Sequence, residues 1–111
     1  MVIHEDIYYE LHGLRFVWDK SKAENNLIKH GIQFEEAASV FVIDEQETFI
    51  DDEHSNDEER LIVIGLSQAL RVLTVVHCLR EDDTFIRIIS ARKATLLERK
   101  LWGRQHYESG I

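Results

Sequence analysis

Two arginines in the C-terminal half of the sequence could hold a phosphate. Residues 85–91 are mostly β-branched or apolar and predict a buried strand. Arg87 lies in the middle of this run, and Arg92 and Lys93 close it. Guanidinium groups suit phosphate oxygens because they donate two parallel hydrogen bonds. The run therefore predicts an anion site, unless its arginines only pair with carboxylates on neighbouring strands.

One reaction for such a site is cleavage of RNA without a metal ion, which is what the family resemblance described below implies. A base must take the proton of the 2′-OH, cations must stabilise charge on the phosphate, and an acid must protonate the leaving oxygen. Arg92 is the first candidate for the phosphate and Arg87 the second. Residues five apart lie on opposite faces of a regular strand. Both arginines can therefore line one site only if the strand bends between them.

Candidates for the proton transfers and for contacts with the RNA backbone lie elsewhere in the sequence. His77 is a candidate proton carrier, or else a half-buried histidine on the apolar face of its strand. Glu59 could act as a base, orient an arginine, or be a solvated carboxylate. Four more cations could contact RNA or simply be exposed: Arg80, Lys93, Arg60 and Lys22. The six histidines show no paired metal-ligand spacing, so we expect no metal ion and no cofactor.

The charge is unevenly distributed along the 111 residues, whose formal net charge is −8. Residues 1–60 contain 5 Lys or Arg and 16 Asp or Glu, a net charge of −11, whereas residues 61–111 contain 8 and 5, a net charge of +3. We expect a basic face on an acidic molecule, which suits a basic protein partner better than general polyanion binding.

The single cysteine fits a reducing cytoplasm. No apolar run predicts a membrane span or a signal peptide.

The pattern of apolar residues predicts an N-terminal extension, residues 1–13, followed by a single domain, residues 14–111. Strands are expected at 14–18, 48–51, 59–66, 70–80 and 85–91, and helices at 19–30 and 34–41. Asp19 is the expected N-cap of the first helix and Gly31 its end. Thr95 and Glu98 form a capping box that begins a C-terminal helix. The extension has no clear period and could contain a short helical turn.

The expected fold class is α+β. The elements follow the order strand, helix, helix, four strands, helix. An antiparallel sheet of about four to five strands would carry the two N-terminal helices and the C-terminal helix on one face, because each helix has one apolar stripe.

Several motifs together resemble the BrnT family of toxins. They include Phe16-Val-Trp-Asp19, Lys29-His30-Gly31, Phe34-Glu-Glu-Ala37, Asp57-Glu-Glu-Arg60, Leu73-Thr-Val-Val-His77 and Ile86-Arg-Ile-Ile-Ser-Ala-Arg92. The resemblance covers residues 15 to about 107. It implies a RelE-like fold and a cytoplasmic endoribonuclease that stops growth by cutting RNA. It also implies a BrnA-like antitoxin partner, expected in a complex of two toxins and two antitoxins, and contact with DNA only through that antitoxin.

Two other functions fit parts of the sequence. The first is a non-catalytic interaction module of the same fold that acts only through its antitoxin-like partner. The second is a DNA-binding regulator that acts alone. The helix at 34–41 presents Glu35 and Glu36 outward, however, and is poorly suited to a major groove. Cleavage of RNA by the purified protein, compared with Arg92→Ala, would separate the ribonuclease from the interaction module. Salt-dependent binding of duplex DNA without a partner would indicate the regulator.

Overall fold

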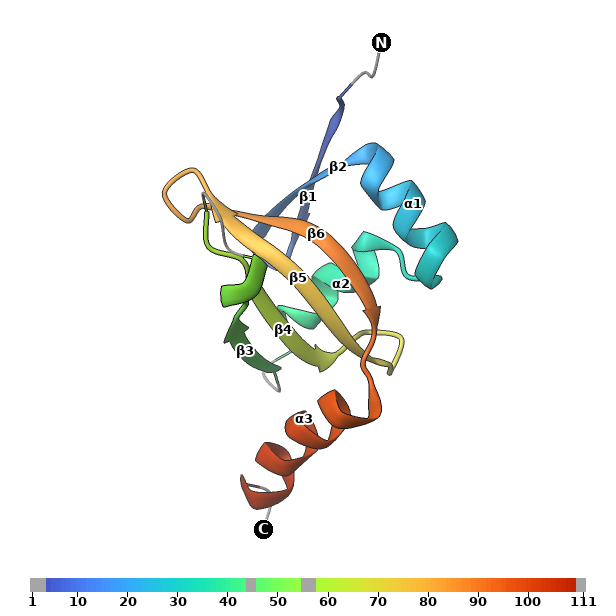
Figure 1. Ribbon diagram of the computed structural model, residues 1–111. Coiled ribbons are helices and arrows are strands. Elements are labelled where there is room, and N and C mark those ends of the chain that lie inside the picture. Colours follow the sequence, from blue (N-terminus) through green and yellow to red (C-terminus); the bar gives the residue numbers. More distant parts are fainter. Residues whose placement is uncertain (1–3, 44–45, 55–57, 110–111) are drawn as a thin grey trace.

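The computed structural model describes residues 4–43, 46–54 and 58–109, which form one sheet and its covering helices (Figure 1). The strands are β1 (Asp6–Leu11), β2 (Leu14–Asp19), β3 (Gln46–Ile50), β4 (Leu61–Leu66), β5 (Val72–Arg80) and β6 (Phe85–Lys93). The helices are α1 (Lys20–His30), α2 (Phe34–Val40) and α3 (Leu96–Ser109), and a short 3-10 helix, η1 (Asp52–His54), follows β3. Across these ranges the six strands lie in the order β1-β2-β6-β5-β4-β3.

The first strand, β1, lies within the predicted N-terminal extension. It pairs antiparallel with β2 along its whole length, from Asp6 opposite Asp19 to Leu11 opposite Leu14. The turn residues His12 and Gly13 have φ angles of 49° and 83°, as a tight two-residue hairpin requires. The expectation of a short helical turn was therefore wrong for residues 4–13, and residues 1–3 of the extension lie outside the described residues. This strand is why the sheet has six strands rather than the expected four to five.

One strand pair departs from the expected antiparallel arrangement. β2 pairs parallel with β6, with Phe16 opposite Ile86 and Val17 opposite Arg87. The chain between these strands forms α1, α2 and the outer strands before it returns to the centre of the sheet. β3, β4, β5 and β6 form a continuous antiparallel ladder, which confirms the antiparallel arrangement predicted for the strands at 59–66, 70–80 and 85–91.

Helices α1 and α2 lie together against one face of the sheet (Figure 1). Asp19 caps α1 by accepting a hydrogen bond from the backbone N–H of Lys22 at 3.0 Å, and Gly31 ends it with a φ of 71°. Both ends were predicted. Side chains from α2, β2, β4, β5, β6 and the loop between α1 and α2 fill the core: Phe16, Trp18, Ile32, Phe34, Ala37, Ala38, Val40, Val63, Leu73, Val75, Ile88 and Ala91.

A buried amide joins α1 to the centre of the sheet. The Asn26 side chain donates to the carbonyls of Ile32 and Ala91, at 3.0 and 2.8 Å, and accepts from the Ala91 N–H at 3.1 Å. The Ala91 bonds span 65 residues of sequence. Because every one of these groups would otherwise be unsatisfied in the core, Asn26 sets where α1 sits on β6.

Helix α3 begins as predicted but does not share the sheet face that α1 and α2 cover. Glu98 accepts a hydrogen bond from the Thr95 N–H at 2.8 Å, and Thr95 Oγ1 accepts from the Glu98 N–H at 3.1 Å, which confirms the capping box. Beyond this turn α3 extends away from the body (Figure 1), and Leu96, Leu97 and Leu101 are exposed. The helix contacts β4, and Glu98 accepts a hydrogen bond from Thr74, whose side chain points away from the core face between Leu73 and Val75. The expectation that all three helices cover one face of the sheet was therefore wrong. No helix in the described ranges is long and apolar enough to cross a membrane.

Candidate functional site

A β-bulge in β6 brings Arg87 and Arg92 to the same face of the sheet. Arg92 lies opposite Thr74, and Arg87 lies opposite Cys78, with a shift of register between them. The shift leaves Ile89 as an extra residue, since Ser90 pairs with Val76 and Ile88 with His77. Both arginines therefore point away from the face that α1 and α2 cover. The bend that the sequence analysis required is present.

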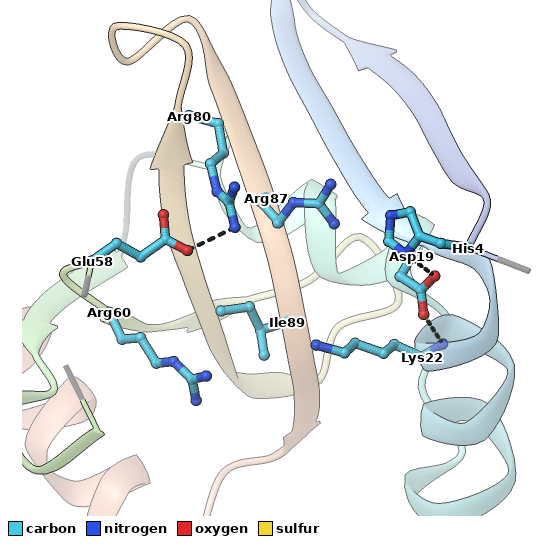
Figure 2. A pocket seen from close by; sticks show the side chains of 8 residues that line it. All are labelled: His4, Asp19, Lys22, Glu58, Arg60, Arg80, Arg87 and Ile89. Carbon is cyan, nitrogen blue, oxygen red and sulfur yellow. Dashed lines mark hydrogen bonds and ion pairs between the residues drawn. The ribbon is translucent and has the colours of Figure 1, made fainter. Parts of the chain in front are cut away.

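An open pocket on this face collects four cationic side chains. Its volume is about 330 Å³, and it is lined by His4, Asp19, Lys22, Glu58, Arg60, Arg80, Arg87 and Ile89 (Figure 2). The cations come from α1 (Lys22), the residue before β4 (Arg60), the end of β5 (Arg80) and the middle of β6 (Arg87). Figure 2 shows Lys22 reaching from its helix toward Ile89. Four of the eight predicted site residues thus meet in what we call the cationic pocket.

Arg87 is more enclosed than Arg80 in this pocket. Its side chain is 17% exposed, and its Nη2 lies 2.9 Å from Asp6 Oδ1 on β1. The hydrogen bond from Arg87 lowers the pKa of the Asp6 carboxyl. Arg87 Nε is buried and has no hydrogen-bond partner. Arg80, by contrast, forms a half-exposed ion pair with Glu58 at 2.7 Å. Since both pairs are solvent-accessible at least in part, an incoming phosphate could compete with the carboxylates.

A histidine that the sequence analysis did not select lies at the rim of the cationic pocket. His4 Nε2 lies 2.8 Å from Asp6 Oδ1, and His4 Nδ1 lies 3.2 Å from Asp19 Oδ1. Its side chain is 64% exposed, so it is held in place yet open to a ligand. Sequence reasoning missed it because the residues before Leu14 were not recognised as a strand that pairs with β2.

Arg92 lies on the same face but outside this pocket, where it holds the start of α3. Its Nη1 and Nη2 lie 2.7 and 2.9 Å from the two carboxylate oxygens of Glu98. Glu98 also accepts a hydrogen bond from Thr74 Oγ1 at 2.9 Å. These bonds, led by that of Arg92, lower the pKa of Glu98 to about 2. The Arg92 guanidinium thus donates to both Glu98 oxygens within this cluster, where it stabilises the start of α3.

His77 lies on the opposite face of the sheet, against the core. It is 4% exposed, and its ring makes an edge-to-face contact with Phe41 at 4.8 Å between centroids. Burial lowers its pKa to about 4, partly offset by a backbone hydrogen bond with Val75. His77 is therefore neutral at neutral pH. It does not line the cationic pocket, which lies on the other face of the sheet.

The other two predicted residues also lie outside the lining of the cationic pocket. Glu59 is exposed, while its neighbour Glu58 supplies the carboxylate that pairs with Arg80. Lys93 lies opposite Leu73, on the helix-covered face, and lines a separate pocket with Arg71 and Arg99. In the part of the chain that the structure describes, no group of three or more His, Cys, Asp or Glu is placed to hold a metal ion.

Comparison with known proteins places this architecture in a family. A family model described as "Ribonuclease toxin, BrnT, of type II toxin-antitoxin system" matches residues 18–98, well over half of the chain. The chain belongs to the BrnT toxin family. As a BrnT toxin it is the toxin component of a type II toxin–antitoxin system, which implies an antitoxin partner. A search of curated proteins found no match.

A solved structure shares the BrnT fold. The crystal structure of the Brucella abortus ribonuclease toxin, BrnT, is 24% identical, with a TM-score of 0.54, and the match covers 70% of this chain and 92% of that chain. This similarity supports the fold alone. The matched family range begins at residue 18, so β1, with His4 and Asp6, lies before it.

Proposed function

We propose that this BrnT toxin is an endoribonuclease that binds the RNA phosphate in the cationic pocket and needs no metal ion. The observation that carries the proposal is the convergence of Lys22, Arg60, Arg80 and Arg87 from four separate parts of the chain. Four cations line the 330 Å³ pocket against two carboxylates, Asp19 and Glu58. They still outnumber the carboxylates when Asp6, which pairs with Arg87 from outside the lining, is included. A net positive pocket on a protein of net charge −8 favours a local anion such as a phosphate.

In the proposed reaction, the RNA supplies its own nucleophile. The 2′-oxygen attacks the adjacent phosphorus, a P–O2′ bond forms, and the P–O5′ bond breaks, which leaves a 2′,3′-cyclic phosphate and a 5′-OH. Arg87 and Arg80 stabilise the charge that builds on the phosphate oxygens. Lys22 and Arg60 bind the phosphate or the next one along the chain.

His4 is our candidate for the proton transfers. Once one ring nitrogen exchanges its carboxylate partner for the RNA, the imidazole would take the proton of the 2′-OH and pass it to the 5′-oxygen. Its carboxylate partners, Asp6 and Asp19, hold the ring at the rim of the pocket. His77 and Glu59 stay predictions without a place in this mechanism. Arg92 and Lys93 lie outside the cationic pocket, and we assign Arg92 the role of holding α3.

The decisive experiment is cleavage of a fluorescent RNA by the purified protein. We expect Arg87→Gln to slow cleavage by about 100-fold or more, the usual effect of losing one donor to a developing oxyanion. Lys100→Gln removes the same charge from α3, outside the cationic pocket, and should leave the rate unchanged. His4→Ala should slow cleavage while leaving the affinity for a 2′-O-methyl RNA intact. No cleavage by the wild type would favour the interaction module instead, and equal rates for wild type and Arg87→Gln would refute the site.

We further propose that the antitoxin partner is BrnA-like, forms a complex of two toxins and two antitoxins, and inhibits by covering the cationic pocket. A basic segment of the partner would contact the acidic part of the toxin beside the pocket, since residues 1–60 have a net charge of −11. The mass of the purified complex, measured by light scattering, tests the stoichiometry. Hydrogen exchange or cross-linking at Arg80 and Lys22, compared between the free toxin and the complex, tests whether the antitoxin covers the cationic pocket. A complex that is inactive while these residues stay exposed would exclude steric cover.

A further inference from the structure

A second hollow adjoins the cationic pocket and has a different chemical character. Its volume is about 210 Å³, and it shares Arg80 and Arg87 with the cationic pocket. Its remaining lining includes two aromatic rings, Tyr8 and Phe85, and the apolar side chain of Val17. Because two side chains line both hollows, a single ligand can occupy both of them at once.

The two aromatic rings form a corner. The Tyr8 and Phe85 centroids are 5.7 Å apart, and the ring planes meet at 74°. Tyr8 is 64% exposed, so its ring is open to a ligand. Arg15 lies over the Phe85 ring, with its Cζ 5.7 Å from the centroid, and so helps to fix that ring. A planar group stacked on the Tyr8 ring would therefore also contact the Phe85 ring.

The charges of this hollow suit an uncharged group better than a phosphate. Its two arginines are balanced by two carboxylates, Asp6 and Glu81. Asp6 already pairs with Arg87 at 2.9 Å. A phosphate would therefore be drawn to the cationic pocket, where cations are in excess, while an uncharged planar group would meet little repulsion here.

We propose that Tyr8 and Phe85 form a stacking subsite for the nucleobase next to the phosphate held in the cationic pocket. Single-stranded RNA is bound mainly by stacking of its bases on aromatic side chains beside cations that hold the backbone. Because Arg80 and Arg87 line both hollows, a phosphate in one hollow and the neighbouring base in the other can belong to the same nucleotide. Tyr8 comes from β1, which precedes the matched family range, and Phe85 from β6, which lies within it.

This inference rests on the proposed function, and binding measurements test the two separately. Fluorescence anisotropy would compare a short 2′-O-methyl RNA, which lacks the nucleophile, with the same oligomer made abasic at one nucleotide. Tyr8→Ala should weaken binding of the intact oligomer about 5- to 150-fold, as expected for the loss of one stacked base. It should leave binding of the abasic oligomer unchanged, and Tyr8→Phe should retain the wild-type affinity. Phe49→Ala, which removes an exposed aromatic ring from the opposite edge strand β3, is the matched control.

The outcomes distinguish the two proposals. If Tyr8→Ala weakens both oligomers equally, or neither, the stacking subsite is wrong, while cleavage that depends on Arg87 would still support the proposed function. If the wild type binds neither oligomer, the cationic pocket is not an RNA site and both proposals fail. Since Tyr8 is exposed, the variant should fold, which its circular dichroism spectrum would confirm.

Discussion

The buried histidine predicts a loss of stability in mild acid that a single substitution should remove. His77 has a pKa of about 4 in the folded protein because burial disfavours the charged ring, against an ordinary value of 6.5. The unfolded chain therefore binds a proton between these values while the folded protein does not. Stability from this residue is fully present above pH 6.5 and is lost as the pH falls toward 4.

The size of the effect follows from the two pKa values. Each pKa unit corresponds to about 1.4 kcal/mol, so the free energy of unfolding should fall by about 2 kcal/mol between pH 7 and pH 5. His77→Leu replaces the ring with an apolar side chain of the same core face and removes the unpartnered Nδ1. This variant should lose about 2 kcal/mol less than the wild type over the same interval.

Urea unfolding at pH 7 and pH 5, followed by tryptophan fluorescence, measures the difference. The buried Trp18 reports on the core. His12→Asn is the matched control, because His12 is exposed in the β1–β2 turn and asparagine tolerates its φ of 49°. It should lose as much stability as the wild type. If the wild type and His77→Leu lose equal stability, His77 is not buried as a neutral ring. Cleavage by His77→Leu should stay close to the wild-type rate, since His77 lies on the other face from the cationic pocket.

Three further predictions concern the contacts that hold the site. Asn26→Ala removes three buried hydrogen bonds and should lower the free energy of unfolding by about 3 kcal/mol, against under about 0.5 kcal/mol for the exposed Asn25→Ala in the same urea assay. Glu98, whose pKa is lowered to about 2, should contribute stability that is present above pH 4.5 and lost as the pH falls toward 2; an acid titration of Glu98→Gln should lack this loss. Affinity for 2′-O-methyl RNA should fall with salt, and Arg80→Gln should lower the slope of log affinity against log salt by about 0.7, whereas an unchanged slope would remove Arg80 from the phosphate contacts.

The N-terminal hairpin changes how this BrnT toxin can be understood. β1 supplies Asp6, which pairs with Arg87, and precedes the matched family range. It also brings His4 to the cationic pocket and Tyr8 to its neighbour. Removal of residues 1–11 would therefore test more than stability, because the proposed proton carrier and the stacking ring would both be lost.

The sequence alone determined the features that depend on near neighbours. The ends of α1 at Asp19 and Gly31, and the capping box of Thr95 and Glu98, were predictable because each involves residues a few positions apart. The antiparallel ladder from β4 to β6 followed from alternating apolar runs joined by short turns. The resemblance to BrnT toxins came from motifs in a fixed order, and the family match over residues 18–98 confirmed it.

Only the tertiary structure decided which side chains meet. The faces of Arg87 and Arg92 depend on a bulge at Ile89, and a shift of one residue moves every later side chain to the other face. The sequence named Lys22, Arg60, Arg80 and Arg87 singly, but their meeting requires strand pairing over long separations in the chain. The alternation in β1 was overlooked because a short strand at the chain end becomes recognisable only beside β2. Local sequence patterns thus predict the helices and strands, whereas the register of strands far apart in the chain determines which side chains form the site.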